Sequence, residues 1–150
     1  MSSKQLDAKS LQRQHYYHFV DIPTRWMDND VYGHVNNVTY YSYFDTTANL
    51  YLIHHCGLDP LRSEIVGYVV SSSCEYVSSL EFPMVLEGGL RVNRLGKSSV
   101  EYGIGVFEKG ASTAAAYGRF VHVFVERSSN SSVAIPDGFR KSLSLLLPRE

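Results

Sequence analysis

The strongest hydrophobic pattern in the chain is a helical one. Aromatic and apolar residues recur three or four positions apart after residue 37, which is the spacing of one face of an α-helix. Gly57 and Pro60 follow this stretch, and a glycine with a proline just beyond it is typical of the end of a helix. We therefore expect one long helix over residues 37–55. Its apolar stripe is formed by Tyr40, Phe44, Ala48 and Tyr51.

Most of the remaining chain alternates apolar residues with small or polar ones. A period of two is typical of a strand that is buried on one face. The dipeptides Gly96-Lys97 and Lys109-Gly110 favour tight turns between such strands. One strand is expected before the helix and four after it. Their predicted ranges are 17–25, 65–80, 86–95, 98–107 and 112–125.

This order of elements predicts the α+β class. Hairpin-linked strands that follow one aromatic helix form a curled antiparallel sheet, with the helix packed on its concave face. Residues 1–16 are predicted to be a polar N-terminal arm, residues 17–127 the folded domain, and residues 128–150 a C-terminal loop and helix of the same domain. In that last part, Asp137 is expected to cap a helix over residues 138–147.

Composition and charge narrow the functional classes. The 150 residues, of which 44% are hydrophobic and 19% charged, are typical of one globular domain and exclude a disordered chain. A formal net charge of -1 gives no electrostatic reason to expect nucleic acid or an anionic membrane as a partner. No apolar run reaches about eighteen residues, so no membrane span is expected. Cys56 and Cys74 do not form a disulfide-framework pattern, which favours a reducing, cytoplasmic location.

Residues 25–37 hold the most informative motif, Arg-Trp-Met-Asp-Asn-Asp-Val-Tyr-Gly-His-Val-Asn-Asn. Two carboxylates, Asp28 and Asp30, stand just before a helix start, where unpaired N–H groups and the positive end of the helix dipole are exposed. Acyl transfer needs a carboxylate that attacks or activates water, and an N–H group that stabilises the oxyanion. The segment resembles the signature of the hotdog-fold acyl-CoA thioesterases of the 4-hydroxybenzoyl-CoA thioesterase type.

The resemblance implies a hotdog fold, in which a curled antiparallel β-sheet wraps around one long central helix, and hydrolysis of an acyl-CoA to a free acid and CoA. It places the catalytic carboxylate, as nucleophile or general base, at Asp30, and the oxyanion donor at the backbone N–H of Asn37. From the residues alone, Asp30 fits equally well as a helix cap or in an Asx turn. Asp28 is expected to be structural, because two free acids would raise each other's pKa and only one is needed.

Four further residues near the motif are candidates. Gly33 fits a turn where the chain passes close to the substrate. His34 is a candidate for polarising or positioning the thioester carbonyl, although packing and hydrogen bonding are favoured over a role as general base. Asn36 is expected to be the helix N-cap. Asp45 is a second acid, on the helix, and would be a hydrogen-bond partner within the site if its helix face turns inward.

A basic hairpin is the candidate binding site for the nucleotide part of CoA. Arg94, Lys97 and Ser98 surround one of the expected turns, and arginine and lysine bind phosphate groups. The resemblance places a basic segment with a serine at this point. Without the resemblance, a solvated hairpin with ordinary surface charges explains the same residues.

Two other functions remain open. A hydratase or dehydratase that acts on an acyl thioester uses a histidine with a separate acid on the helix, and the order of the motif fits that reaction poorly. A non-catalytic acyl-thioester-binding domain has no use for an acid beside an acyl slot, because desolvating the acid costs free energy. No metal or cofactor is expected, since the neighbours in His54-His55-Cys56 point in different directions on a helix.

The expected fold also bears on assembly. A single curled sheet leaves strand edges with unpaired backbone groups. The related enzymes assemble as dimers, often paired again into tetramers, with sites at the shared interface. We therefore expect a homodimer or homotetramer with closed symmetry, in which a neighbouring subunit completes the pocket at Asp30.

Overall fold

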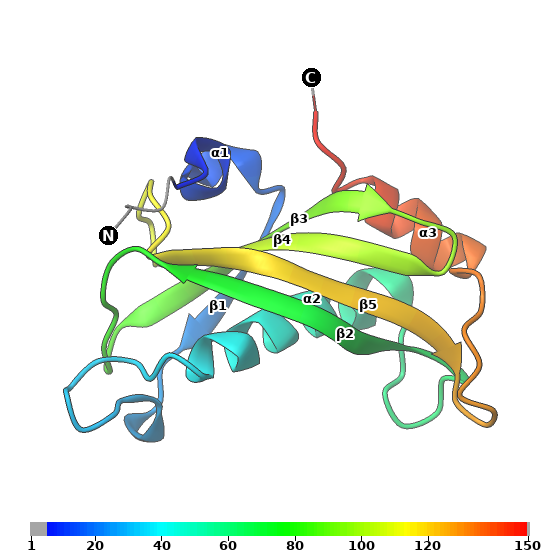
Figure 1. The fold of residues 1–150 in the computed structure, drawn as a ribbon, viewed down its shortest axis with the longest axis horizontal. Helices are drawn as coiled ribbons and strands as arrows, with labels where there is room; N and C mark the ends of the chain where they lie inside the picture. The colour runs from blue at the N-terminus through cyan, green and yellow to red at the C-terminus, as the bar shows by residue number, and fades with distance from the viewer. Residues whose placement is uncertain (1–5, 150) are drawn as a thin grey trace, which may run out of the picture.

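The computed structural model describes residues 6–149 as a curled five-stranded sheet wrapped around one long helix (Figure 1). Residues 1–5 of the predicted arm lie outside the described residues. The main elements are β1 (His18–Pro23), α2 (Thr39–Cys56), β2 (Ile65–Tyr76), β3 (Val85–Leu95), β4 (Ser99–Glu108), β5 (Ala116–Glu126) and α3 (Asp137–Ser144), and the short helical turns are α1 (Ala8–Leu11), η1 (Arg13–His15) and η2 (Trp26–Asp28).

The strands are antiparallel and follow the order β1-β3-β4-β5-β2. All five predicted strands are present. The expectation that hairpins join the four strands after the helix is wrong for β2, which does not pair with β3. β2 pairs with β5, with Gly67 opposite Phe124 and Cys74 opposite Gly118. β2 ends at Tyr76, and the chain then crosses to the other side of the sheet through residues 77–84. β1 and β2 are therefore the two edges of the sheet.

The core lies between α2 and the concave face of the sheet. Alternate residues of β3 and β4 point toward the helix, because side chains of a strand alternate between its two faces. The predicted α+β class, with the helix inside a curled sheet, is confirmed. None of the described helices is long and apolar enough to cross a membrane. The buried side chains of α2 are Tyr40, Tyr43, Phe44, Thr47, Ala48, Tyr51 and Leu52.

Both predicted helix starts need correction. α2 begins at Thr39, two residues later than expected, and its N-cap is Val38 and not Asn36. It ends at Cys56, just before Gly57, close to the predicted end. Asp137 is the first residue of α3 and does not cap it, since the N-cap position is taken by Pro136.

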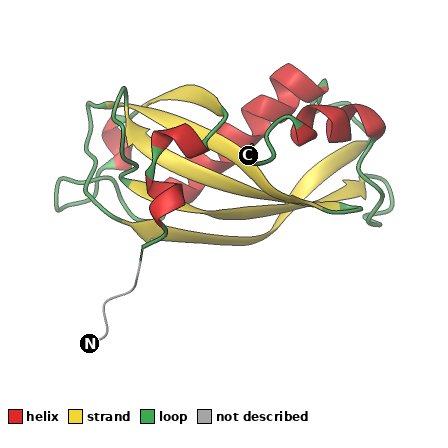
Figure 2. Ribbon diagram, turned by 90° about the horizontal axis from the view of Figure 1, so that it is seen from above, coloured by secondary structure: helices red, strands yellow, loops and turns green. Residues whose placement is uncertain are grey.

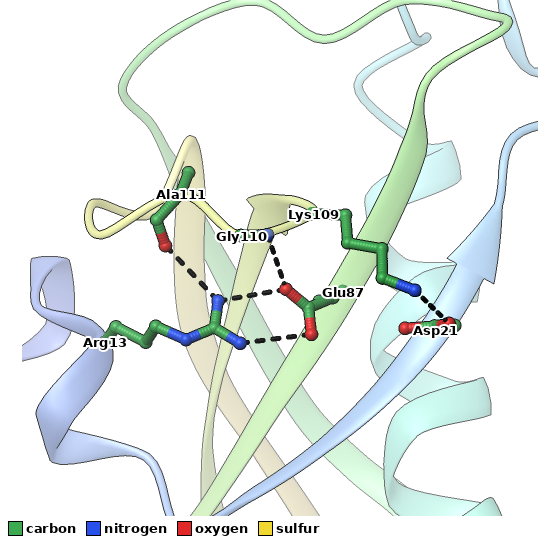
Figure 3. Close-up of polar contacts among 6 residues, drawn as sticks. All are labelled: Arg13, Asp21, Glu87, Lys109, Gly110 and Ala111. Atoms are coloured by element: carbon green, nitrogen blue, oxygen red, sulfur yellow. Dashed lines mark hydrogen bonds and ion pairs between the residues drawn. The ribbon is translucent and has the colours of Figure 1, made fainter.

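Residues 6–16 pack on the convex face of the sheet. Arg13 binds both carboxylate oxygens of Glu87 on β3, at 2.9 and 3.0 Å, and Glu87 also accepts the Gly110 N–H at 2.8 Å (Figure 3). Beside them, Lys109 pairs with Asp21 of β1 at 2.7 Å. The hydrogen bond from Arg13 lowers the pKa of the mostly buried Glu87 carboxyl. These N-terminal turns lie toward one end of the sheet and α3 toward the other (Figure 2).

Candidate active site

Residues 28–37, the acidic loop, form a small hairpin that leads into α2. Asn29 and Val35 face each other as an isolated antiparallel bridge. Between them, the Asp30 N–H donates to the His34 carbonyl at 2.9 Å, and the Gly33 N–H donates to the Asp30 carbonyl at 3.1 Å. Gly33 has a φ of +82°, a conformation that glycine adopts at no steric cost. The loop is therefore an ordered turn with the Asp30 side chain near its start.

The Asp28 carboxylate anchors the acidic loop to α2. Its side chain is only 1% exposed and accepts hydrogen bonds from the Tyr43 hydroxyl at 2.8 Å, the Arg25 N–H at 2.9 Å and the Arg25 Nε at 3.1 Å. Burial and the neighbouring Asp28 raise the pKa of Tyr43, so this hydroxyl keeps its proton and remains a donor. These contacts agree with the structural role predicted for Asp28.

The Asn37 backbone N–H, just before α2, is left without an acceptor among the described residues. The Asn36 N–H donates to the Asp28 carbonyl at 2.8 Å, the Val38 N–H to Oδ1 of Asn36 at 3.2 Å, and the Thr39 N–H to the Asn36 carbonyl at 2.9 Å. The Asn37 N–H donates to no acceptor among residues 6–149. The Asn36 carbonyl and the Asn37 N–H belong to the same trans peptide and point in opposite directions. Because the carbonyl accepts the Thr39 N–H, the Asn37 N–H points away from the helix.

The Asp30 side chain faces an open cavity of about 440 Å³ on one side of the loop. Its Oδ1 accepts the Tyr32 N–H at 2.9 Å, which is the Asx turn that the residue type alone favours. Its Oδ2 accepts no hydrogen bond from the part of the chain that the structure describes. Trp26 and Val31, which are 83% and 94% exposed, give the cavity apolar walls. The carboxylate therefore retains a free oxygen beside apolar surface.

A second cavity, of about 300 Å³, opens at the start of α2. Asn37 and His34 line it together with the rings of Tyr40 and Tyr76. Neither of these two cavities is lined by both Asp30 and Asn37. Within one chain, Asp30 and the free Asn37 N–H therefore lie on the same loop but line different cavities.

Asp45 is not brought to either cavity. The residue is exposed on α2, whereas its neighbour Phe44 is fully buried, because consecutive residues of a helix point about 100° apart. Asn49 donates to the Asp45 side chain at 3.0 Å and to its carbonyl at 2.8 Å. Within one chain, the helix face that carries Asp45 therefore does not turn inward, and Asp45 is not a hydrogen-bond partner within the site.

The basic hairpin lies at the other end of the molecule. Lys97 and Ser98 lie in the turn between β3 and β4 and Arg94 near the end of β3, whereas the acidic loop lies near the opposite end of the sheet (Figure 1). The C-terminal segment packs against this turn, since the Ile135 N–H donates to the Lys97 carbonyl at 2.9 Å. One chain does not bring the hairpin to Asp30. No cluster of three or more metal-binding side chains is found among residues 6–149.

The sequence pattern did not single out Tyr43 and Tyr76, which hold the two ends of the acidic loop. Tyr43 donates to Asp28 as described, and the Tyr76 hydroxyl donates to the Asn37 carbonyl at 2.9 Å. Both residues lie outside the motif, Tyr43 in the helix that follows it and Tyr76 on β2, and belong to apolar helix and strand patterns. A tyrosine at such positions is usually explained by packing, although the hydroxyl of a buried tyrosine usually finds a hydrogen-bond partner.

The chain has clear relatives of known structure. The PA5185 protein from Pseudomonas aeruginosa is 55% identical, with 92% of this chain and 96% of that chain covered and a TM-score of 0.90. A putative thioesterase from the same organism, PA2801, is 28% identical, with 84% and 97% covered and a TM-score of 0.75. A 1,4-dihydroxy-2-naphthoyl-CoA thioesterase from Synechocystis shares the fold at 11% identity, with 84% and 94% covered and a TM-score of 0.75. No curated protein matches the chain at a significant level.

A family model gives the same classification. Residues 32–115, more than half of the chain, match the thioesterase superfamily. The match begins two residues after Asp30 and extends through α2, β2, β3 and β4 to the residue before β5. The resemblance seen in the motif is thus confirmed by the rest of the chain. The chain belongs to the thioesterase superfamily and is a thioester hydrolase.

Proposed function

We propose that this thioester hydrolase acts on acyl-CoA substrates, with Asp30 as the catalytic carboxylate and the Asn37 N–H as the oxyanion donor. The observation that carries the proposal is the free Asn37 N–H in the same ordered loop as a carboxylate with a free oxygen. A preorganised N–H stabilises the charge that develops on a carbonyl oxygen, and costs no reorganisation during the reaction.

Asp30 supports two routes to the same products. As general base, its carboxylate takes a proton from water while the water oxygen bonds to the thioester carbon; the C–S bond then breaks and the CoA thiolate is protonated. As nucleophile, it bonds to that carbon, expels the thiolate, and leaves an anhydride that water hydrolyses. A single turnover in ¹⁸O-labelled water separates the routes. Only the second can leave the label in the Asp30 carboxylate, and it does so when water attacks the aspartyl carbonyl of the anhydride.

The remaining motif residues have supporting roles in this proposal. Gly33 permits the tight turn that carries Asp30. His34 is exposed and lines the cavity beside Asn37, where its ring can donate a hydrogen bond to the substrate. Its backbone carbonyl also accepts the Asp30 N–H. We assign His34 to positioning of the thioester and leave proton transfer to Asp30.

The proposed site is completed by a second copy of the chain. β2 is an edge strand, and the acidic loop and the basic hairpin lie at opposite ends of the molecule. If β2 pairs with β2 of a second copy in antiparallel fashion, the two-fold symmetry sets opposite ends of the two chains side by side. Arg94, Lys97 and Ser98 of one copy then lie toward the acidic loop of the other, where they bind the CoA phosphates. A homodimer, or a homotetramer built from two, follows from this geometry.

The alternative functions have less support. A hydratase needs a histidine and an acid on the helix in one pocket, whereas Asp45 is exposed and His34 lines a cavity without it. A binding domain without activity gives no reason for a carboxylate with a free oxygen at the cavity wall. Hydration of enoyl thioesters would support the first alternative, and binding without turnover the second.

Release of free thiol from a panel of acyl-CoAs tests the proposal. Asp30→Asn should keep the fold and lower the turnover number at least about a hundredfold, the usual scale for loss of an acid–base group. Asp28→Asn is the matched comparison. It should cost thermal stability and much less turnover, because Asp28 is buried and contacts Tyr43 and Arg25. Near wild-type turnover in Asp30→Asn would place the chemistry on another residue.

A further inference from the structure

Three tyrosines, Tyr76, Tyr40 and Tyr43, form a row that joins the end of β2 to both ends of the acidic loop. The Tyr76 ring lies edge-on to the Tyr40 ring with centroids 5.1 Å apart, and Tyr40 lies edge-on to Tyr43 at 5.9 Å. Tyr43 holds Asp28 at one end of the loop, and Tyr76 holds the Asn37 carbonyl at the other. Tyr40 and Tyr43 are each 3% exposed, whereas Tyr76 is 47% exposed. The partly exposed Tyr76 ring therefore packs at the end of a row whose other two rings are buried.

The Asn37 carbonyl needs this outside donor because it is not part of the hydrogen-bond ladder of α2. In a regular helix it would accept the N–H of Tyr41, four residues on. That N–H donates instead to the Val38 carbonyl at 3.3 Å. The Tyr76 hydroxyl occupies the free position at 2.9 Å. This hydrogen bond fixes the peptide between Asn37 and Val38, while the turn at Asn36 fixes the peptide between Asn36 and Asn37.

We propose that Tyr76 is a positioning residue for the oxyanion donor. Its hydroxyl holds the peptide between Asn37 and Val38, so that the Asn37 N–H keeps its direction into the cavity that Asn37 and Tyr76 line. The inference rests on the proposed function, because it assumes that the Asn37 N–H binds the oxyanion. An oxyanion donor is effective only when it is already aimed at the place where the charge develops. Without the bond from Tyr76, rotation of the peptide between Asn37 and Val38 changes the direction of the Asn37 N–H.

Steady-state kinetics of Tyr76→Phe test the inference. This variant keeps the ring and its contact with Tyr40 and removes only the hydroxyl. We expect the turnover number to fall about tenfold, a fraction of the 100- to 1000-fold loss that follows complete removal of an oxyanion donor. The Michaelis constant should change by less than about twofold, because the weakened interaction is formed mainly in the transition state. Affinity for a non-hydrolysable thioether analogue should also be unchanged, since that molecule develops no oxyanion.

Tyr68→Phe is the matched control. Tyr68 lies on the same strand and is 44% exposed, and its hydroxyl forms no hydrogen bond within residues 6–149. Its turnover number should remain at the wild-type value. Equal losses in both variants, a wild-type turnover number in Tyr76→Phe, or a raised Michaelis constant alone would overturn the inference. The proposed function fails separately, since it requires turnover of acyl-CoA by the wild type and its loss in Asp30→Asn.

Discussion

His122, on β5, is a fully buried histidine that takes no part in the proposed reaction. Its Nδ1 atom lies 3.1 Å from the Tyr102 hydroxyl, and its Nε2 atom has no hydrogen-bond partner among the described residues. Burial lowers the pKa of His122 from 6.5 to about 4, because no nearby group compensates the charge of a protonated ring. The folded protein therefore keeps this ring neutral at pH values where an unfolded chain protonates it.

We predict that the free energy of unfolding falls as the pH is lowered from 6.5 to about 4. In this window the unfolded chain binds a proton that the folded chain does not, and above it the stability is fully present. Lowering the pKa of His122 from 6.5 to about 4 corresponds to about 3 kcal/mol. Urea unfolding at a series of pH values measures the effect in the wild type and in His122→Asn. Most of the slope should disappear in the variant.

The control for this prediction is His54→Asn, which removes an exposed histidine and should leave the slope as it is. A wild-type slope in His122→Asn would assign the acid sensitivity to another group. His18 is the next candidate, because burial and the neighbouring His55 also lower its pKa.

At this scale, the sequence predicted which residues form the loop but not how their hydrogen bonds are distributed. Asp28 and Asp30 are two positions apart and differ because Tyr43, fifteen residues away, reaches only the first. Asn36 was predicted to be the helix cap; it does accept a hydrogen bond two residues on, as asparagine often does, but the helix starts later. Such differences depend on contacts between distant parts of the chain, which a local pattern does not contain.

Among the elements, α2 and β3 approach each other closely at Gly88. A Cβ atom at this position would collide with Thr47 Oγ1 and lie 3.1 Å from Ile22 Cδ1. Thr47 is fully buried on α2, and its hydroxyl donates to the Tyr43 carbonyl at 2.8 Å, so its side chain is not free to move aside. Gly88 therefore sets how closely the helix packs on the sheet.

We predict that Gly88→Ala destabilises the fold by about 1–3 kcal/mol, the usual cost of an extra group in a well-packed core. Gly138→Ala is the matched control, because a Cβ at that exposed position of α3 meets no atom within 4 Å. It should stabilise the protein slightly, since alanine favours a helix over glycine. Urea denaturation of both variants gives the comparison. Equal stability of the two variants would show that α2 can shift without cost.

The alternation of apolar residues predicted all five strands but not their order in the sheet. Period-two patterns report that one face of a strand is buried, and they carry no information about its neighbours. Short turns identify the hairpins at Gly96 and Gly110. The connection between β2 and β3 has no such signal, and β2 in fact crosses to pair with β5. This placement makes β2, like β1, an edge of the sheet to which a second subunit can add.

For the whole molecule, the unpaired edge of β2 is the main feature that one chain leaves unexplained. β2 is a long strand, Ile65–Tyr76, and its exposed apolar residues include Val69 at 46% and Val70 at 60%. Natural proteins usually protect such edges with charges or cover them. The sequence suggested an unpaired edge and an oligomer, but the opposite placement of the acidic loop and the basic hairpin required the structure. Pairing through β2 accounts for both features.

We predict that Val70→Lys on β2 converts the proposed dimer or tetramer into a monomer and lowers the turnover number at least about tenfold. A lysine on an edge strand opposes pairing with a second copy, and in the proposed assembly the separated chain loses the basic hairpin of the other copy. Light scattering at micromolar concentration gives the assembly, and thiol release from acyl-CoA gives the activity. Leu145→Lys is the control, because Leu145 is similarly exposed, at 64%, and lies beyond α3, away from β2. A monomeric Val70→Lys variant with full activity would contradict the shared site, and a monomeric wild type would contradict the assembly itself.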